Sequence, residues 1–226
     1  GGTIAEYRWE VAQKPSGSGV VLGSPNLVET GFMFANGSKT GVDLAGEYVV
    51  HLNVVDDLGT QSITPCALTF DAIPSDTIHV QLIWDTDIGD MDLHLIKQNT
   101  AGQFCGTHDG AVSASCGYTG DSICYFGNCR SIWGSRPDWD AVTGVSAGDP
   151  VLDIDDLRGY GPENINIDVA VPGVYLVAAD NFSREANVGN TVRVYLYGQL
   201  TGEFFHILDN PSGDDFWEVA VIYWPG

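Results

Sequence analysis

Apolar and polar residues alternate along much of this chain with a period of two, which is typical of half-buried β-strands. In TIHVQLIW, residues 77–84, the alternation places Ile78, Val80, Leu82 and Trp84 on one face. No segment has the apolar stripe of an amphipathic helix. The same pattern predicts strands in YVVHLNVV (48–55), MDLHLI (91–96), TVRVYLYG (191–198) and FWEVAVIYW (216–224). The chain is therefore predicted to be all-β.

Two of these strands carry specific expectations about which side chains face the core. FWEVAVIYW alternates Trp217, Val219, Val221 and Tyr223. MDLHLI directs Met91, Leu93 and Leu95 to one face and Asp92, His94 and Ile96 to the other. If the leucines face the core, Asp92 points outward.

Turn residues punctuate these short strands, since the chain contains 28 glycines and 10 prolines. Short strands separated by such turns are typical of β-sandwiches, and a chain of 226 residues can hold two of them. The Pro-containing stretch DAIPSD, residues 71–76, marks the expected boundary. We therefore expect one sandwich in residues 1–75, which is long enough for seven strands, and a larger one in residues 76–226.

The charge of the chain narrows the possible partners. Acidic residues outnumber basic residues by 30 to 9, which gives a formal net charge of −21. This balance argues against nucleic acids and anionic membranes as partners, because phosphate binding requires clustered Lys and Arg. No run approaches the about 20 apolar residues that a membrane-inserted helix needs. The excess of acidic over basic residues is typical of an extracellular protein that binds divalent cations.

Two acidic stretches could bind such a cation. The first, DTDIGDMDLHL (85–95), contains Asp85, Asp87, Asp90 and Asp92. The second, GDPVLDIDDLRGYGPENINI (148–167), contains Asp149, Asp153, Asp155, Asp156 and Glu163. Crowded carboxylates repel one another unless they are neutralised, and Ca²⁺ prefers six to eight oxygen ligands on loops that bend easily.

These nine residues are therefore the predicted Ca²⁺ ligands, and the Asp138–Asp140 stretch could add another. Neither stretch has the spacing of an EF-hand loop. The alternative is that the aspartates are turn residues and strand-end caps.

Four cysteines, Cys105, Cys116, Cys124 and Cys129, fall in a polar, glycine-rich stretch. Disulfides would hold such a stretch in place, and we expect Cys105 to pair with Cys116 and Cys124 with Cys129. Other pairings and a four-cysteine zinc site remain alternatives, although the spacing is not that of a zinc ribbon. The fifth cysteine, Cys66, is either a free thiol or the partner of one of the four.

The same region contains a possible binding platform, FGNCRSIWGSRPDWD (126–140), with two tryptophans and two arginines: Trp133, Trp139, Arg130 and Arg136. Exposed aromatic residues commonly contact sugars or protein partners. Alternatively, both tryptophans cover the open end of the sandwich.

Catalysis is not expected. The five histidines are scattered, and the chain has no H-E-x-x-H motif. His94 beside Asp92, and the His108–Asp109 pair, are the residues that could support a hydrolytic site.

YRWEV (7–11), KPSGSG (14–19) and DLAGEYVVHLNVVDDLGTQS (43–62) resemble the immunoglobulin-like PKD domain. This resemblance implies that residues 1–75 form an immunoglobulin-like sandwich whose core Trp9 fills. Such domains usually act as spacers or adhesive modules.

The succession DMDLHL, PDW, DPVLDIDDLRGYGPENI, TVRVYLYG and WEVAVIYWP runs through residues 77–226. It resembles an uncharacterised C-terminal module of bacterial surface proteins. The stretches LIWD and DMDLHLIKQ, followed by VPGVYLVAAD, are also similar to prepeptidase C-terminal domains of secreted proteases. That resemblance implies a jelly-roll-like sandwich that binds Ca²⁺ through acidic residues at the start of a strand. The insertion at residues 102–148, which the predicted disulfides would staple, departs from that family.

The resulting hypothesis is a non-catalytic, Ca²⁺-binding β protein of the extracellular space or cell surface. It would act as a surface, adhesive or filament-forming subunit that associates with itself or with other surface proteins. The alternative is a substrate-targeting module of a secreted hydrolase, which would bind polysaccharide or an extracellular-matrix protein such as collagen.

Overall fold

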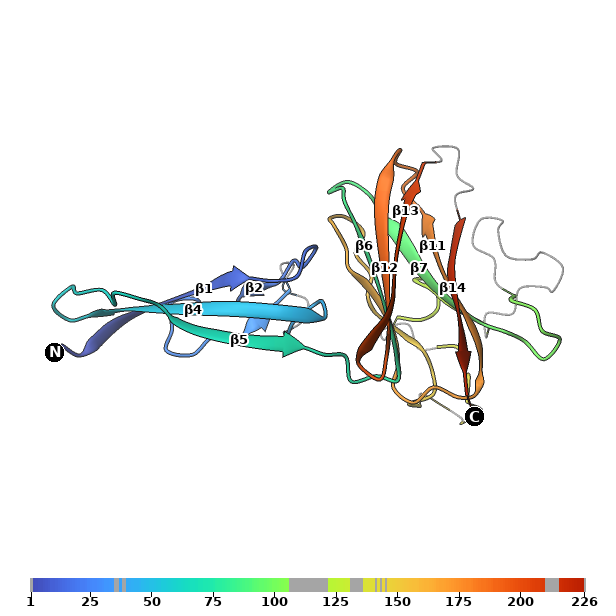
Figure 1. Cartoon of the computed structure of the whole chain (residues 1–226), viewed down its shortest axis with the longest axis horizontal. Coiled ribbons are helices and arrows are strands. Elements are labelled where there is room, and N and C mark those ends of the chain that lie inside the picture. The colour runs from blue at the N-terminus through green and yellow to red at the C-terminus, as the bar shows by residue number, and fades with distance from the viewer. Residues whose placement is uncertain are drawn as a thin grey trace. The chain divides into compact units, whose positions relative to one another are not determined.

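The computed structural model describes residues 2–34, 37, 40–105, 122–130, 136–140, 142, 144, 146–209 and 216–225. All regular elements in these ranges are β-strands, so the all-β prediction is confirmed. The chain divides into two compact units, Gly1–Ile73 and Pro74–Gly226, and the division falls within DAIPSD (Figure 1). Among the described residues, no helix has the length and apolar character needed to cross a membrane.

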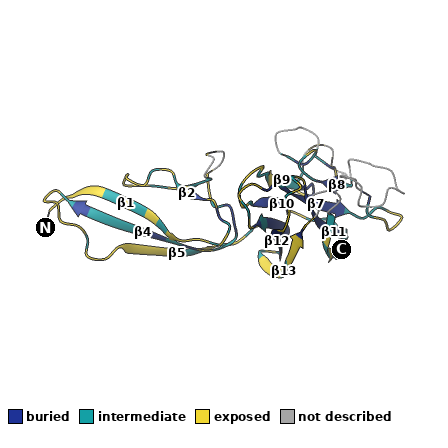
Figure 2. Ribbon diagram, turned by 90° about the horizontal axis from the view of Figure 1, so that it is seen from above, coloured by how far each residue is buried: buried dark blue, intermediate teal, exposed yellow. Residues whose placement is uncertain are grey.

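The first unit contains a three-stranded antiparallel sheet of order β1-β4-β5 and a two-stranded one. The strands are β1 (Ile4–Gln13), β2 (Val21–Leu22), β3 (Phe32–Met33), β4 (Gly46–Asp56) and β5 (Cys66–Ala72). The described part of this unit thus has five strands, fewer than the seven for which its length suffices. Much of β5 is exposed (Figure 2).

Tyr48 rather than Trp9 occupies the centre of this unit. Tyr48 is fully buried, and its ring stacks on Phe70 with the centroids 5.4 Å apart. Trp9 is only half-buried because it lies on the edge strand β1, and its Nε1 donates to the carbonyl of Leu27 at 2.9 Å. The expectation that Trp9 fills the core is therefore wrong.

The second unit is a sandwich of two antiparallel sheets. The five-stranded sheet, of order β13-β12-β6-β10-β9, contains β6 (Ile78–Trp84), β9 (Val151–Ile154), β10 (Glu163–Ile167), β12 (Val188–Leu196) and β13 (Gln199–Leu208). The four-stranded sheet, of order β14-β11-β7-β8, contains β7 (Met91–Lys97), β8 (Ile123–Cys124), β11 (Gly173–Asn181) and β14 (Phe216–Trp224).

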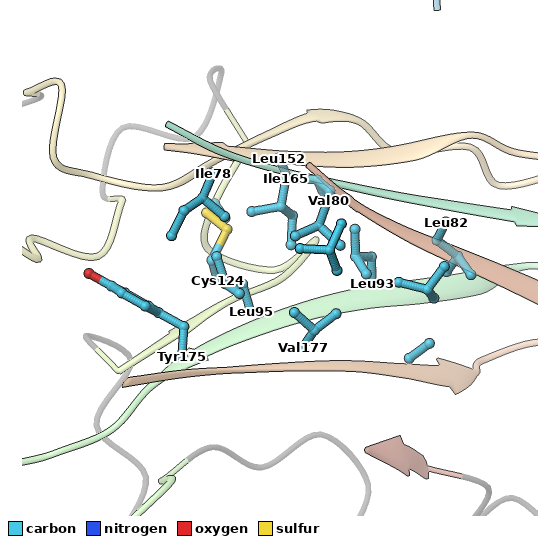
Figure 3. Close-up of a cluster of buried hydrophobic side chains, with 14 of the residues drawn as sticks. Ile78, Val80, Leu82, Leu93, Leu95, Cys124, Leu152, Ile165, Tyr175 and Val177 are labelled. Atoms are coloured by element: carbon cyan, nitrogen blue, oxygen red, sulfur yellow. A yellow bond between two sulfur atoms is a disulfide. The ribbon is translucent and has the colours of Figure 1, made fainter. Parts of the chain in front are cut away.

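Apolar side chains from both sheets fill the space between them (Figure 3). The inward faces of β6 and β7 are those that the alternation predicts: Ile78, Val80, Leu82 and Trp84, and Met91, Leu93 and Leu95. Burying one such side chain contributes about 1.5–3 kcal/mol. This core fixes the direction of every other side chain on these strands, including the charged ones.

In β14 the predicted alternation fails in its second half. Val177 of β11 is opposite Ala220, but the next residue, Ala178, is opposite Glu218, so Val219 is an extra residue in β14. Such a β-bulge shifts the side-chain alternation by one position. Trp217 and Val219 therefore pack on the core before the bulge, and Ile222 and Trp224 do so after it. Val221 and Tyr223, predicted to face the core, are exposed.

We expect Ile222→Ala to lower the free energy of unfolding by at least about 2 kcal/mol, because it removes buried methyl groups from the core. Val221→Ala should lower it by less than about 1 kcal/mol, because that side chain faces solvent. Urea denaturation of both variants measures the two costs. A larger cost for Val221→Ala would contradict the bulge.

Candidate metal site

The outer face of β7 is covered, although its residues point away from the sandwich core. Asp92, His94 and Ile96 have exposed fractions of only 2%, 0% and 0%. Ile96 forms a second apolar cluster with its neighbours in the same sheet, Ile123 of β8 and Leu176 of β11, and Phe104, Tyr125 and Phe216 pack against this cluster. The ring of His94 lies 5.9 Å from that of Tyr125, in a stacked arrangement, and 5.4 Å from that of Phe216. The prediction that Asp92 points out of the core holds, but it does not point into solvent.

At the start of β7, carboxylates from four chain segments converge. Asp92 is directly opposite Asp180 of β11. One oxygen each of Asp92, Asp155 and Glu163 lie within 4.8 Å of one another, and so do ligand atoms of Asp92, His94 and Asp180. Asp92 therefore belongs to both groups. Asp90 lies close to them, since the charges of Asp155 and Asp180 contribute to raising its pKa. The five carboxylates are called the carboxylate cluster: Asp90, Asp92, Asp155, Glu163 and Asp180.

Glu163 is the most deeply placed member. It lies on the same face of β10 as Ile165 and Ile167, which are in the core, and it is fully buried. Its Oε2 accepts the backbone N–H of Leu93 at 2.7 Å; among the described residues, β8 pairs with β7 at Leu95 and Ile96 and not at Leu93. Its Oε1 has no hydrogen-bond partner among the described residues.

Burial, followed by the charge of Asp92, raises the pKa of Glu163 well above its usual value. The Leu93 N–H opposes this effect, and the charges of Asp155 and Asp90 add to it. A carboxylate in this position needs either a proton or a cation.

Arg130 provides positive charge at the edge of the cluster. Its guanidinium lies 2.5 Å from Oδ2 of Asp155, whose side chain is 3% exposed. Arg130 directly follows Cys129, which is disulfide-bonded to Cys124, and it forms an isolated parallel bridge with Leu152 of β9. The short disulfide loop thus brings Arg130 to the chain segment that carries Asp155.

Asp90 and Asp156 lie at the solvent side of the cluster. Burial raises the pKa of Asp90 to about 6, and the charges of Asp155, Asp156 and Asp180 contribute. Burial also raises the pKa of Asp156, but backbone N–H groups of Arg158 and Gly161 oppose the shift. Asp156 therefore acts as a turn residue beside the cluster.

The remaining predicted ligands have other roles. Asp85 is exposed and accepts the backbone N–H of Gly189 at 2.9 Å, whereas Asp87 lies exposed in the loop. Asp153 accepts a hydrogen bond from the Asn166 side chain. These three residues belong to none of the possible metal-binding groups in the described part of the chain. For Asp85, the alternative of a strand-end cap fits better, whereas Asp153 lies within β9.

Asp149 belongs to a separate acidic group with Asp138 and Asp140. Its Oδ1 accepts the N–H of Trp139 at 2.9 Å, and its Oδ2 accepts that of Ser146 at 3.0 Å. Both oxygens are therefore engaged in holding the loop.

Trp139, one of the two tryptophans of the predicted binding platform, is buried and does not form part of the surface. This side chain is 5% exposed, belongs to the sandwich core, and lies 5.5 Å from the ring of Tyr175. The alternative, that it covers the end of the sandwich, describes its position better. Arg136 is half-buried, and Trp133 lies outside the described residues.

The cysteine region contains the disulfide Cys124–Cys129, with the Cα atoms 5.1 Å apart. Cys105 is also disulfide-bonded, and Cys116, its expected partner, lies outside the described residues. These bonds exclude a zinc site made of four thiolates. Cys66 is a free, exposed thiol. The disulfide indicates a non-reducing compartment.

Asp180 and His94 were not among the ligands predicted from the sequence, although both belong to a group that could hold a metal ion. Asp180 ends the strand VYLVAAD far from both acidic stretches, and only the pairing of β11 with β7 brings it opposite Asp92. The signal available in the sequence was the i, i+2 spacing of Asp92 and His94, which places both on one face.

We expect the stability of the metal-free protein to depend on the charge of Asp90. Because its folded pKa of about 6 lies above its unfolded value, Asp90 stabilises the fold below the unfolded value, and that contribution is lost as the pH rises through 6. The free energy of unfolding of the native chain, relative to Asp90→Asn, should therefore fall between about pH 5 and about pH 7 in EDTA.

Urea denaturation of both proteins at the two pH values measures this difference. The buried His79, whose pKa burial lowers to about 4, acts in the opposite direction, but its contribution is common to both proteins. If the difference in free energy of unfolding between the two proteins is the same at both pH values, the cluster does not raise the pKa of Asp90.

Comparison with known proteins gives no relative, since no family model, no curated protein and no solved structure matches the chain. The resemblances to PKD and prepeptidase C-terminal domains therefore remain predictions.

Proposed function

We propose that the chain is a non-catalytic extracellular protein that a Ca²⁺ ion stabilises at the carboxylate cluster. It serves as a structural or adhesive component of a cell surface. The observation that carries this proposal is Glu163, a fully buried carboxylate with one oxygen engaged by Leu93 and the other without a hydrogen-bond partner among the described residues.

The magnitude of the repulsion supports a bound cation. At 4.8 Å, the upper limit of the separations in the Asp92–Asp155–Glu163 group, two ionised carboxylates repel by about 3–4 kcal/mol at an effective dielectric constant of about 20. Several such pairs would cancel much of the 5–15 kcal/mol that typically stabilises a folded domain. Arg130 offsets part of this repulsion at Asp155, and a divalent cation would offset more.

The donor set favours Ca²⁺ over other ions. Asp92, Asp155 and Glu163 offer hard carboxylate oxygens from a strand end, a loop and a second strand. Ca²⁺ accepts six to eight oxygens in irregular geometry, whereas Mg²⁺ demands a near-ideal octahedron and retains its water.

A structural role fits the environment of the residues that could act chemically. His94, the histidine beside the cluster, is fully buried and packs against Tyr125 and Phe216. The disulfide supports secretion, because such bonds persist in oxidising compartments.

Self-association is supported by the edge strand β13. It is 10 residues long, and its exposed apolar side chains include Leu200, Phe205 and Ile207. An exposed, apolar edge strand is a ready site for pairing with another chain. The alternative of a targeting module loses support because Trp139 is in the core.

The direct test is thermal melting with Ca²⁺ and with EDTA, combined with light scattering. We expect Ca²⁺, but not Mg²⁺, to raise the melting temperature by several degrees, since ligand at about 100 times its Kd adds about 2.7 kcal/mol. Glu163→Gln should lose most of this increase, yet in EDTA it should be at least as stable as the native chain. The glutamine removes a buried charge and still offers an oxygen to Leu93.

Asp87→Asn is the matched control because it removes an exposed aspartate of the same acidic stretch. It should retain the full response to Ca²⁺. An equal response in Glu163→Gln, or no response in the native chain, would contradict the proposed site. Large particles that EDTA disperses would support Ca²⁺-dependent assembly, and a monomer under both conditions would contradict self-association.

A further inference from the structure

Asp155 takes part in two charge interactions that compete with each other. One of its oxygens belongs to the Asp92–Asp155–Glu163 group that could hold a metal ion. Its Oδ2 lies 2.5 Å from a guanidinium nitrogen of Arg130. Apart from this ion pair, neither oxygen of Asp155 has a hydrogen-bond partner among the described residues. The carboxylate that the metal ion would bind is therefore already paired with a cation of the chain itself.

An independent observation at the same group points to a bound cation. The exposed fraction of Glu163 is 0%, and its Oε1 has no hydrogen-bond partner among the described residues. Arg130 thus compensates one carboxylate of the group and leaves this buried oxygen available to a ligand.

The backbone around Arg130 holds its guanidinium against Asp155. Cys129, the preceding residue, is bonded to Cys124, and both cysteines are fully buried. The carbonyl of Cys129 accepts the backbone N–H of Leu152 at 3.0 Å, and Arg130 forms its parallel bridge with the same leucine. Leu152 is on β9, which ends one residue before Asp155. A cation held in place in this way loses little entropy when it forms the ion pair, so it competes well with an ion from solution.

The two partners of this ion pair differ in their access to solvent. The side chain of Asp155 is 3% exposed, whereas that of Arg130 is 33% exposed. A metal ion that enters the group can therefore displace the guanidinium toward water, where a charged arginine head is readily solvated.

The charge of Arg130 determines how this competition changes the affinity for Ca²⁺. The affinity of a Ca²⁺ site depends on the number of charged ligands that it offers. Arg130 cancels one of the three carboxylate charges of the group, and at close range it repels a divalent ion. Binding of Ca²⁺ has either to break the ion pair or to tolerate this repulsion, and both lower the affinity.

We propose that Arg130 is an internal competitor of the metal ion: it neutralises Asp155 in the metal-free protein and lowers the affinity of the carboxylate cluster for Ca²⁺. This inference rests on the proposed function, because it concerns the affinity of the same site. In the opposite arrangement, the guanidinium orients Asp155 toward the ion, and its removal weakens Ca²⁺ binding.

Calorimetric titration of the native chain and of Arg130→Gln with Ca²⁺, both freed of metal beforehand, tests this inference. Glutamine keeps a side-chain N–H beside Asp155 but removes the positive charge. We expect the Kd for Ca²⁺ to fall by at least about tenfold in Arg130→Gln. Arg130→Lys, which keeps the charge, should bind Ca²⁺ with a Kd within about threefold of the native value.

Arg193→Gln is the matched control, because it removes the same charge from the chain. Arg193 pairs with Glu203 at 2.7 Å, and Glu203 belongs to none of the possible metal-binding groups in the described part of the chain. The Kd of this variant for Ca²⁺ should stay within about twofold of the native value, because salt screens a charge outside the site.

A measurement on the native chain keeps the inference falsifiable if Arg130→Gln does not fold. The side-chain Nε–H signals of Arg130 and Arg193 are followed by NMR during titration with Ca²⁺. Saturation should change the signal of Arg130, because the ion displaces or repels its guanidinium, and should leave that of Arg193 as it was. An Arg130 signal that stays the same at saturation would overturn the inference.

The two proposals fail separately. Ca²⁺ binding by the native chain, with an equal or higher Kd in Arg130→Gln, would overturn the competition and leave the Ca²⁺ site intact. Ca²⁺ binding by Arg130→Gln alone would support the competition, since Arg130 then fully replaces the ion in the native chain, and would overturn the proposal that Ca²⁺ stabilises that chain. An absence of binding in both proteins would overturn both proposals.

Discussion

The placement of a carboxylate inside the sandwich is the constraint on which the rest of this site depends. Glu163 lies where the alternation of β10 would otherwise place an apolar side chain, and water cannot solvate it there. A buried charge costs several kcal/mol unless hydrogen bonds and an opposite charge compensate it. The Leu93 N–H provides the first of these, and the ion pair of Arg130 seen in the described part of the chain is with the neighbouring Asp155. The remaining compensation must come from protons or from bound ions.

The aromatic residues on the outer face of β7 increase the cost of burying these carboxylates. Phe104, Tyr125 and Phe216 shield the outer face of β7, so Asp92 has little more access to solvent than Glu163 has. In a low dielectric both repulsion and ligation become stronger. The segment that follows β7, with its Cys124–Cys129 disulfide, therefore contributes to the electrostatics of the site as well as to its shape.

The periodicity of the sequence predicted the sandwich core well where one face is strictly apolar, as in Ile78–Trp84. It could not locate the bulge in β14, because FWEVAVIYW is apolar at nearly every position and a one-residue shift leaves the pattern almost unchanged. The same limit applies to Trp139. A tryptophan in a polar loop has no periodic context, so the sequence does not indicate whether it is exposed or buried.

For the site, crowding of aspartates along the chain was only a partial guide. Asp90 and Asp92 were found together with Asp155 and Glu163, because strand ends gather at one end of a sandwich. Asp85 lies in the same stretch but caps a strand by accepting the Gly189 N–H, an arrangement that depends on a residue more than 100 positions away. Asp180 could be recognised only from the register of β11 against β7, and the local sequence does not specify that register.

The bond between Glu163 and Leu93 also has a mechanical consequence. Glu163 belongs to the five-stranded sheet and Leu93 to the four-stranded one, so this contact and the cluster around it tie the two layers together. The first strand of the unit, β6, and the last, β14, likewise lie in different layers. A pulling force applied through those two strands therefore has to pass from one layer to the other. Under the proposed function, a cation bound at the cluster would add to the resistance of this contact between the layers.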